Sequence, residues 1–237
     1  MNLLGIVQSI HQEAALPGAA PTTVAGQSGR AADLVRWAIE AYNDIQRERN
    51  GRWKWLRRKF TLNTVADTIS YAYTDCTDVD AATPIARFRD WHFDENEPPL
   101  IYLVSDGQST ERKLTIHPWA EFRDDYQVGT HTSAYPGWIS RDVLNKLYLG
   151  PKPDGIYLVS GDFWRSNQIL ADDNDIPEMP TDYHMLIVYR AIVKYGFNIV
   201  AQEKLARART EGEPLWNGLV QNQHHGLWSL TTSGPLA

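Results

Sequence analysis

Residues 50–73, NGRWKWLRRKFTLNTVADTISYAY, contain the point at which the spacing of apolar side chains changes. Before them, residues 28–49 carry apolar side chains at helical spacing, which predicts an amphipathic helix. From Phe60 onward, apolar and polar residues alternate, which predicts a β-strand. The stretch therefore predicts the end of a helical part of the chain and the beginning of a β-rich part.

The predicted helix over residues 28–49 has one charged and one apolar face. Ser28 fits an N-cap, and Asn50 with Gly51 fits the end of the helix. The apolar face consists of Leu34, Trp37, Ala38, Ala41 and Ile45. A shorter helix is predicted near the N-terminus, ahead of a loop over residues 16–29 that is rich in Gly, Pro, Thr and Ala.

From Phe60 to about Arg165, short runs of β-branched and aromatic residues are separated by turn sequences such as Asp-Gly, Pro-Gly and Pro-Asp-Gly. This pattern predicts an antiparallel β-region. Within it, residues 118–127 are predicted to form one or two turns of helix.

The chain is predicted to become helical again at Thr181 and to remain so, as one helix, until Gly212 and Pro214. Between Leu186 and Val200 this helix is apolar nearly all round, which is typical of the central helix of a bundle. After Pro214 we expect a turn or two of helix and then a C-terminal tail.

These elements predict an α+β fold, in which the N- and C-terminal helices form a small helical bundle with an antiparallel β-rich insertion between them. The expected parts are residues 1–57 for the N-terminal helices, 58–176 for the insertion, 177–214 for the central C-terminal helix and 215–237 for a C-terminal extension.

The composition of the 237-residue chain is that of a globular protein with an excess of bulky aromatics. A formal net charge of −6 argues against a protein that grips nucleic acid with its whole surface. Nine tryptophans and eleven tyrosines indicate a surface rich in partners, because these side chains favour interfaces. The single cysteine, Cys76, excludes an internal disulfide, and no apolar run is long enough to predict a membrane span.

The sequence offers little evidence of catalysis. P-loop, dinucleotide-binding, serine-hydrolase and metalloprotease motifs are missing, so we expect neither a cofactor nor a metal ion. Two acidic clusters could in principle hydrolyse a glycosidic bond. They consist of Glu121, Asp124 and Asp125, and of Asp172, Asp173 and Asp175. We favour a structural role for the second cluster, because Asp and Asn are common in turns for their local hydrogen bonds.

The segment from Arg47 to Lys59 concentrates seven bases around Trp53 and Trp55. One interpretation is contact with nucleic acid, in which cations neutralise phosphates and an indole stacks on a base. The other is structural, because cations at a helix C-terminus complement the helix dipole and two tryptophans can anchor the corner between bundle and insertion. On this chemistry we favour the structural interpretation.

The order of these features resembles the head-to-tail adaptor (connector) proteins of tailed bacteriophages, in particular the podovirus-like family. A helix end of the type W-x-W that leads into a strand F-x-L-x-T-x-A is matched by Trp53, Trp55, Phe60, Leu62, Thr64 and Ala66. A Pro-x-Pro-Asp turn and an acidic lead-in to an apolar helix are matched by Pro151, Pro153, Asp154, Asp173, Asp175, Pro177 and Pro180. Asp67 departs from the pattern, which has glycine in that turn.

The resemblance implies a structural virion protein without an active site, which assembles as a dodecameric ring beneath the portal. Such a ring extends the DNA channel and joins the capsid vertex to tail tube or nozzle proteins. The implied partners are the portal protein, these tail proteins and further copies of the chain, while viral DNA passes through the lumen without sequence-specific binding. Assembly is implied to occur in the bacterial host cytoplasm, and the mature location is the head-to-tail interface of the virion.

We expect interface residues near the end of the first long helix and in the C-terminal part of the chain. The candidates are Trp53, Trp55, Arg57, Arg58, Trp216, His224, His225 and Trp228. Two other functions stay open at this point. One is another head-completion or tail-tube component of a phage, and the other is a carboxylate-dependent hydrolase of cell-wall glycans.

Overall fold

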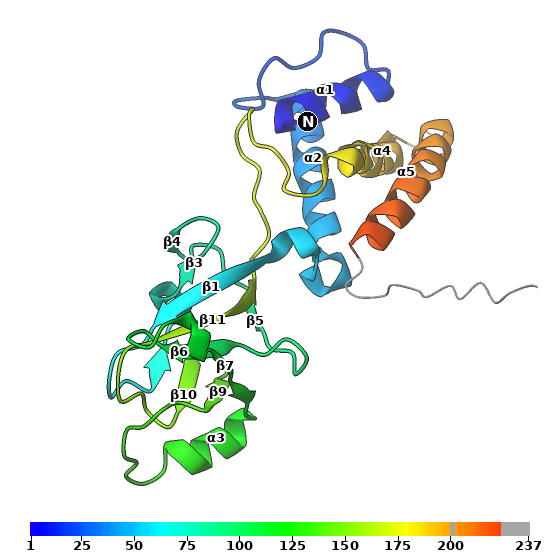
Figure 1. Cartoon of the computed structure of the whole chain (residues 1–237). Coiled ribbons are helices and arrows are strands. Elements are labelled where there is room, and N and C mark those ends of the chain that lie inside the picture. Colours follow the sequence, from blue (N-terminus) through cyan, green and yellow to red (C-terminus); the bar gives the residue numbers. More distant parts are fainter. Residues whose placement is uncertain (200–201, 224–237) are drawn as a thin grey trace, which may run out of the picture. The chain divides into compact units, whose positions relative to one another are not determined.

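The computed structural model describes residues 1–199 and 202–223, and it confirms the predicted α+β fold. Helices lie at both ends of the sequence and strands in its middle (Figure 1). The chain forms two compact units: a helical unit made of residues 1–55 with those from Asn167 onward, and a β unit made of residues 56–166. Among the described helices, none is long and apolar enough to cross a membrane.

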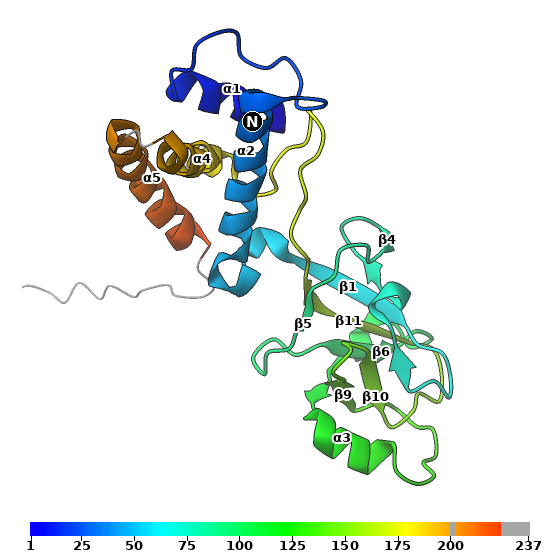
Figure 2. The same ribbon diagram turned by 180° about the vertical axis from the view of Figure 1, so that it is seen from behind.

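The helical unit is built around one central helix. Its helices are α1 (Leu3–Glu13), α2 (Gly29–Arg47), α4 (His184–Ile199) and α5 (Gln202–Asn222), with a 3-10 turn at Thr181–Tyr183 before α4. In Figure 1, and from behind in Figure 2, α4 lies between α2 and α5. Because α4 contacts α1, α2 and α5, it needs apolar side chains on nearly every side.

The prediction of a single C-terminal helix that ends at Gly212 and Pro214 is wrong. The structure has two helices in this region, and α5 continues through Pro214 to Asn222. Gly212 is buried, and a Cβ placed on it would lie 3.4 Å from the Cβ of Tyr189 on α4. The glycine therefore permits a close approach of the two helices. Tertiary packing outweighs the local tendency of glycine and proline to end a helix.

The segment that leads back to α4 is fastened to α2 by hydrogen bonds. Gln46 is fully buried, and its side-chain amide donates to the carbonyl of Gln168 (3.0 Å) and accepts from the amide of Gln168 (2.7 Å). The Tyr42 hydroxyl donates to the side-chain carbonyl of Gln168 (2.7 Å). These contacts satisfy polar groups that burial would otherwise leave without partners.

The β unit contains two sheets and one α-helix, α3 (Trp119–Tyr126), which confirms the predicted helical turns. Its strands are β1 (Arg57–Asn63), β2 (Ser70–Tyr71), β3 (Thr77–Asp78), β4 (Thr83–Pro84), β5 (Asp90–His92), β6 (Leu100–Leu103), β7 (Arg112–Lys113), β8 (Thr115–Ile116), β9 (Trp138–Arg141), β10 (Leu147–Gly150) and β11 (Tyr157–Trp164).

Strand β11 is the centre of the larger sheet, whose order is β4-β3-β1-β11-β6-β7, with β5 also paired to β11. Strand β1 pairs with residues 158–164 of β11, while β6 and β5 share the other edge of β11. The smaller sheet has the order β2-β10-β9-β8. Pairing within the β unit is antiparallel, as predicted, except that β8 and β9 run parallel.

Both sheets contribute to one apolar core. From the larger sheet, Phe60 and Trp91 pack edge to face with ring centroids 4.7 Å apart, and Val159 is fully buried. From the smaller sheet, Ile139 and Leu149 are fully buried in the same cluster. Side chains from segments far apart in the sequence therefore hold the β unit together, as is usual in sheet proteins.

The turn after β1 explains the departure at Asp67. This residue has a φ of 62°, the left-handed conformation in which glycine is most common and Asp is tolerated. Its amide donates to the carbonyl of Pro153 (2.8 Å), and the hydroxyl of Ser133 donates to its carboxylate. Asp67 therefore adopts a left-handed conformation that glycine takes readily, and hydrogen bonds hold it there.

Candidate interface: the tryptophan cluster and the basic segment

The basic segment, residues 47–59, begins where α2 ends. Arg49, Asn50 and Gly51 have φ values of 54°, 56° and 65°, so three successive residues are left-handed and turn the chain sharply. Such a conformation is costly for a residue with a Cβ, about 1–2 kcal/mol for arginine. We infer that contacts made by the following residues stabilise this turn.

Trp53 provides these contacts. Its side chain is fully buried, and its indole N–H donates to the carbonyl of Ile45 in the last turns of α2 (2.9 Å). Trp55 stacks on it with ring centroids 4.7 Å apart and an angle of 15° between the planes. The guanidinium of Arg49 lies 5.3 Å from the centre of the Trp53 ring, within the range of cation–π attraction.

Trp216 brings α5 into the same cluster. Its ring lies edge to face against Trp53, with centroids 5.7 Å apart. The guanidinium of Arg190 on α4 lies 4.5 Å from the centre of the Trp216 ring, and Arg190 forms an ion pair with Glu48. We call Trp53, Trp55 and Trp216 the tryptophan cluster. It joins the end of α2 to α4 and α5 within the helical unit.

A further hydrogen bond places the end of α5 beside the cluster. The ammonium group of Lys54 donates to the carbonyl of Asn222 (3.2 Å), one residue before the end of the described chain. A cation at the C-terminal end of a helix also complements the helix dipole. The last described residues of α5 therefore lie beside Lys54 of the basic segment.

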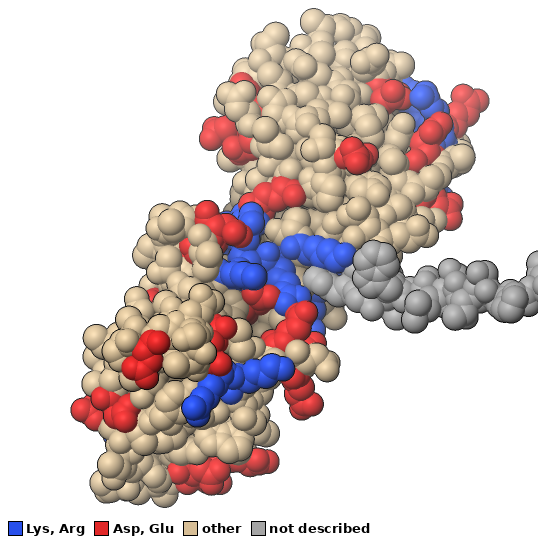
Figure 3. Space-filling view, in the orientation of Figure 1, with Lys and Arg blue, Asp and Glu red and all other residues tan. Residues whose placement is uncertain are grey.

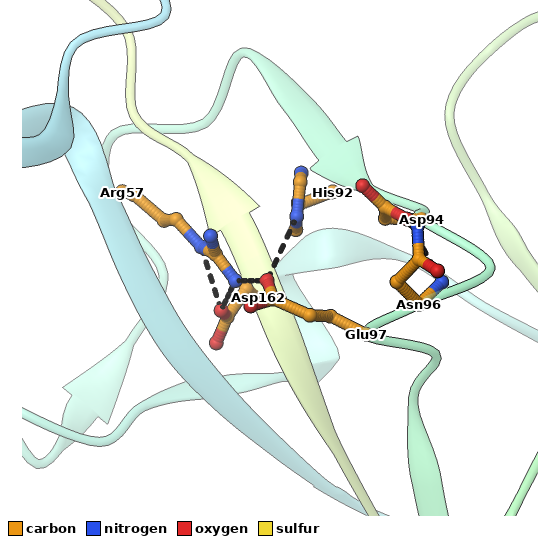
Figure 4. A network of polar contacts seen from close by, with 6 residues as sticks. All are labelled: Arg57, His92, Asp94, Asn96, Glu97 and Asp162. Carbon is orange, nitrogen blue, oxygen red and sulfur yellow. Dashed lines mark hydrogen bonds and ion pairs between the residues drawn. The ribbon is translucent and has the colours of Figure 1, made fainter. Parts of the chain in front are cut away.

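Arg57 opens the part of the basic segment that belongs to the β unit, and it is held by two carboxylates. Its Nε donates to Asp162 on the neighbouring strand β11 (2.7 Å), and its Nη2 forms an ion pair with Glu97 (Figure 4). His92 lies 3.5 Å from the same Glu97 carboxylate. The side chains of Arg57 and Asp162 are only 21% and 19% exposed, so solvent weakens their attraction less than at an open surface.

The charges of this network support one another. Hydrogen bonding to Arg57 and the positive charge of that residue lower the pKa of Glu97. Partial burial opposes the charge of Arg57, but the hydrogen bonds and negative charges of Glu97 and Asp162 outweigh it and raise the pKa of the guanidinium. Arg57 is therefore neutralised within the β unit.

The other bases of the segment differ in how far they are paired. Arg58 forms an exposed ion pair with Asp80 (2.7 Å), and Arg47 lies 4.0 Å from Asp44. For Arg52 and Lys59, both exposed, the described residues provide no ion-pair partner. Figure 3 shows Lys and Arg interspersed with Asp and Glu on this face of the molecule. The segment is not a continuous array of free cations.

The family comparison covers the two units together. A family model described as SU10 adaptor protein matches residues 1–221. The chain belongs to the SU10 adaptor protein family. It is therefore a phage adaptor, a structural component of the virion, as the resemblance implies. No curated protein matches the chain.

The match includes five of the eight candidate interface residues, and these lie in both units of the adaptor. Trp53, Trp55 and Trp216 come together in the tryptophan cluster, whereas Arg57 and Arg58 lie on β1. His224, His225 and Trp228 lie outside the described residues.

The acidic cluster of Asp172, Asp173 and Asp175 has a structural role in the adaptor. The Asp175 carboxylate accepts hydrogen bonds from the amides of Ala171 (2.7 Å) and Asp172 (2.8 Å), which lowers its pKa. The Asp173 carboxylate accepts from the amide of Val24 (2.5 Å). The backbone carbonyls of Asp173 and Asp175 accept from two amides in the first turn of α1. The cluster therefore connects α1 to the lead-in of α4.

The other acidic cluster lies on α3. His117 lies 2.9 Å from the Asp125 carboxylate and 3.6 Å from that of Glu121, and Asp124 pairs with Arg123. The three carboxylates are 60–68% exposed, so they face solvent and are not enclosed in an apolar pocket such as the one that surrounds a buried general acid. Across residues 1–199 and 202–223, no group of three or more His, Cys, Asp or Glu residues could hold a metal ion.

Sequence reasoning found the tryptophans and bases but not their partners. Glu48 and Arg190 are separated by 142 residues, and Arg57 and Asp162 by 105. No local spacing indicates such pairs, because they depend on how the helices and strands pack. The W-x-W motif indicated the position of the cluster, whereas nothing in the sequence indicated that Trp216 completes it.

Proposed function

We propose that the adaptor assembles as a ring of twelve copies beneath the portal, extends the DNA channel and joins the capsid vertex to tail tube or nozzle proteins. The observation that carries this proposal is the match to the adaptor family over residues 1–221. In a cyclic ring each subunit presents two different faces to its neighbours. The abundance of Trp and Tyr suits such interfaces.

The tryptophan cluster is proposed to position the parts of the adaptor that meet other proteins. Trp53 contacts Trp216, and Lys54 binds the carbonyl of Asn222, so the end of α5 has a defined place in the helical unit. The C-terminal extension that starts there is proposed to reach the portal, with His224, His225 and Trp228 as contact residues. Trp53 and Trp55 act as anchors, and Arg58 contacts a neighbouring subunit or the portal.

The role proposed toward DNA is passage without sequence-specific binding. The adaptor carries a net charge of −6, and several cations of the basic segment are occupied by carboxylates of the same chain. A wall of like charge repels phosphates and lets the duplex slide. A strongly basic lumen in an assembled ring would contradict this part of the proposal.

We propose further that the adaptor has no catalytic activity, and that it is assembled in the host cytoplasm before it becomes part of the virion. The exposed carboxylates of α3 and the hydrogen-bonded ones near α4 support a structural role. We expect no hydrolysis of cell-wall glycans by the adaptor. Substitution of Asp124, Asp125, Asp172 and Asp173 by asparagine should therefore leave the measured rate of hydrolysis unchanged at background.

The test is molar mass by light scattering on the adaptor alone and mixed with the portal ring of its own phage. We expect a complex that contains one portal ring and twelve adaptors. Arg58→Glu should reduce incorporation, whereas Arg123→Glu, a matched change of a surface arginine on α3, should not. An adaptor that stays monomeric beside its portal would refute the ring.

A further inference from the structure

A groove of about 720 Å³ lies open on the helical unit, with walls from α2, α4 and α5. Apolar side chains and a glycine form much of its lining, namely Leu186, Tyr189, Val193, Ala208, Gly212 and Trp216. This volume lies within the range of pockets that hold small molecules or a few side chains. The described residues leave this groove open to solvent.

Two cations on the α4 wall of the groove already have counter-ions. Lys194 binds Asp44 of α2 (2.8 Å), and Arg190 is paired with Glu48 and lies over Trp216. Because these cations already have counter-ions, an acidic ligand would gain little from them. An apolar segment without formal charge fits the groove better.

The chain itself contains such a segment. Fourteen residues, 224–237, follow the last described residue, and none of them is Asp, Glu, Lys or Arg. Among them, Leu227, Trp228 and Leu230 form the apolar sequence LWSL around Ser229. The indole offers the largest apolar surface of any side chain, with a polar N–H that can stay at the rim.

The length of the chain allows this segment to return to the groove. Trp228 comes five residues after Gln223, and five extended residues span at most about 18 Å. Along α5, Trp216 lies about 10 Å and Gly212 about 16 Å before Gln223, at 1.5 Å per residue. Trp228 can therefore reach the part of the groove between these two residues.

We propose that residues 227–230 of the same chain occupy this groove in the free adaptor, with Trp228 as the anchor. A short connection gives the segment an effective concentration of about millimolar, far above that of a second copy at micromolar protein. The groove is then covered until a competing surface displaces the segment. This inference concerns the free protein and does not depend on the proposed ring.

The experiment uses engineered thiols in the full-length chain. One variant carries Glu213→Cys at the edge of the groove together with Ser229→Cys. Its control carries Glu211→Cys with the same Ser229→Cys. Both glutamates are exposed, but two residues along a helix place Glu211 about 200° away, and it does not line the groove. The native Cys76 is fully buried and its pKa is raised to about 12, so it does not compete for oxidation.

In a glutathione redox buffer without portal, the first variant should form a disulfide within one chain at least about tenfold faster than the control, as measured by mass spectrometry. Addition of Trp228→Ala to it should reduce the rate to that of the control. Equal rates for the two pairs, or no effect of Trp228→Ala, would overturn the proposal. Disulfide-linked dimers as the main product would overturn it in favour of a second copy. Binding of the adaptor to its portal is measured separately, so either proposal can fail alone.

Discussion

The cations of the basic segment have different partners in the two units of the adaptor. In the helical unit, Arg49 of the segment lies over the Trp53 ring, just as Arg190 of α4 lies over Trp216, so the tryptophan cluster supplies an apolar surface for both. In the β unit, Arg57 lies between the carboxylate of Asp162 on β11 and that of Glu97 in the loop between β5 and β6. A run of bases that is continuous in the sequence is therefore divided between two structures. This division teaches that local charge density does not by itself make a phosphate-binding surface.

The largest effect is expected from Trp53→Ala. Loss of a fully buried indole and of its hydrogen bond to Ile45 should lower the free energy of unfolding of the helical unit by about 3–5 kcal/mol. Trp55→Ala is the matched control, and it should cost less than half as much, because Trp55 is only partly buried. Urea unfolding followed by circular dichroism measures both. A folded Trp53→Ala ring that retained DNA abnormally would instead favour the nucleic-acid interpretation of the segment.

An intermediate effect is expected in the β unit from Asp162→Asn. This change leaves Arg57 with only one carboxylate. Because the side chains of Arg57 and Asp162 are each about one-fifth exposed, the free energy of unfolding should fall by about 1.5–3 kcal/mol. Asp80→Asn removes the partner of Arg58 on the same strand, but that pair is 37% and 55% exposed, so less than about 1 kcal/mol is expected. Similar costs for the two changes in urea unfolding would show that burial does not distinguish these pairs.

The smallest effect is a pH dependence that differs between the units. Burial, with the positive amine of Met1 nearby, lowers the pKa of His184, which is 2% exposed. Its Nε2–H donates to the carbonyl of Met179 (3.0 Å), and its Nδ1 accepts from the Met1 amine (2.9 Å). This arrangement requires a neutral ring. In the unfolded chain the imidazole titrates near pH 6.5, at about its ordinary pKa.

The sign of the effect follows from linkage. Because the folded pKa of His184 is the lower one, its contribution to stability is complete above about pH 6.5 and is lost as the pH falls toward the folded pKa. In the β unit, the lowered pKa of Glu97 has a similar effect only below about pH 4.5, the ordinary pKa of that carboxyl. Hydrogen exchange should therefore detect a loss of stability in the helical unit alone when the pH falls from 7 to 5. The His184→Gln variant should lack this pH dependence. An equal loss in both units would contradict this difference.

Much of the fold could be predicted from the sequence, because its elements are strongly periodic. The apolar faces of α2 and the near-uniform apolar surface of α4 need no knowledge of neighbours to be recognised. The turn at Asp67 shows where pattern matching fails. Glycine was expected there, yet aspartate takes the same left-handed conformation with the help of Pro153 and Ser133.

The candidate interface was predictable only in part. The residues Trp53, Trp55, Arg57 and Arg58 stand next to one another in the sequence and are conspicuous there. The carboxylate partners of Arg57 and Arg58 come from positions more than twenty residues away, and Trp216 lies more than one hundred and fifty residues from Trp53. Whether a cation is free or neutralised depends on those partners, so composition alone could not settle the choice between DNA contact and structural support.

The sequence by itself determined the class of the protein: helices at both ends, strands between them, and motif residues in the order typical of phage adaptors. Local periodicity and short-range turn chemistry are sufficient for the helices and strands, since both act over a few residues, whereas the adaptor family came from the resemblance of the motifs. Only the tertiary structure decided that α5 continues through Pro214, that Trp216 joins Trp53, and that Arg57 lies between Asp162 and Glu97. These features depend on contacts between distant segments, which form when apolar faces pack and bring their polar neighbours together.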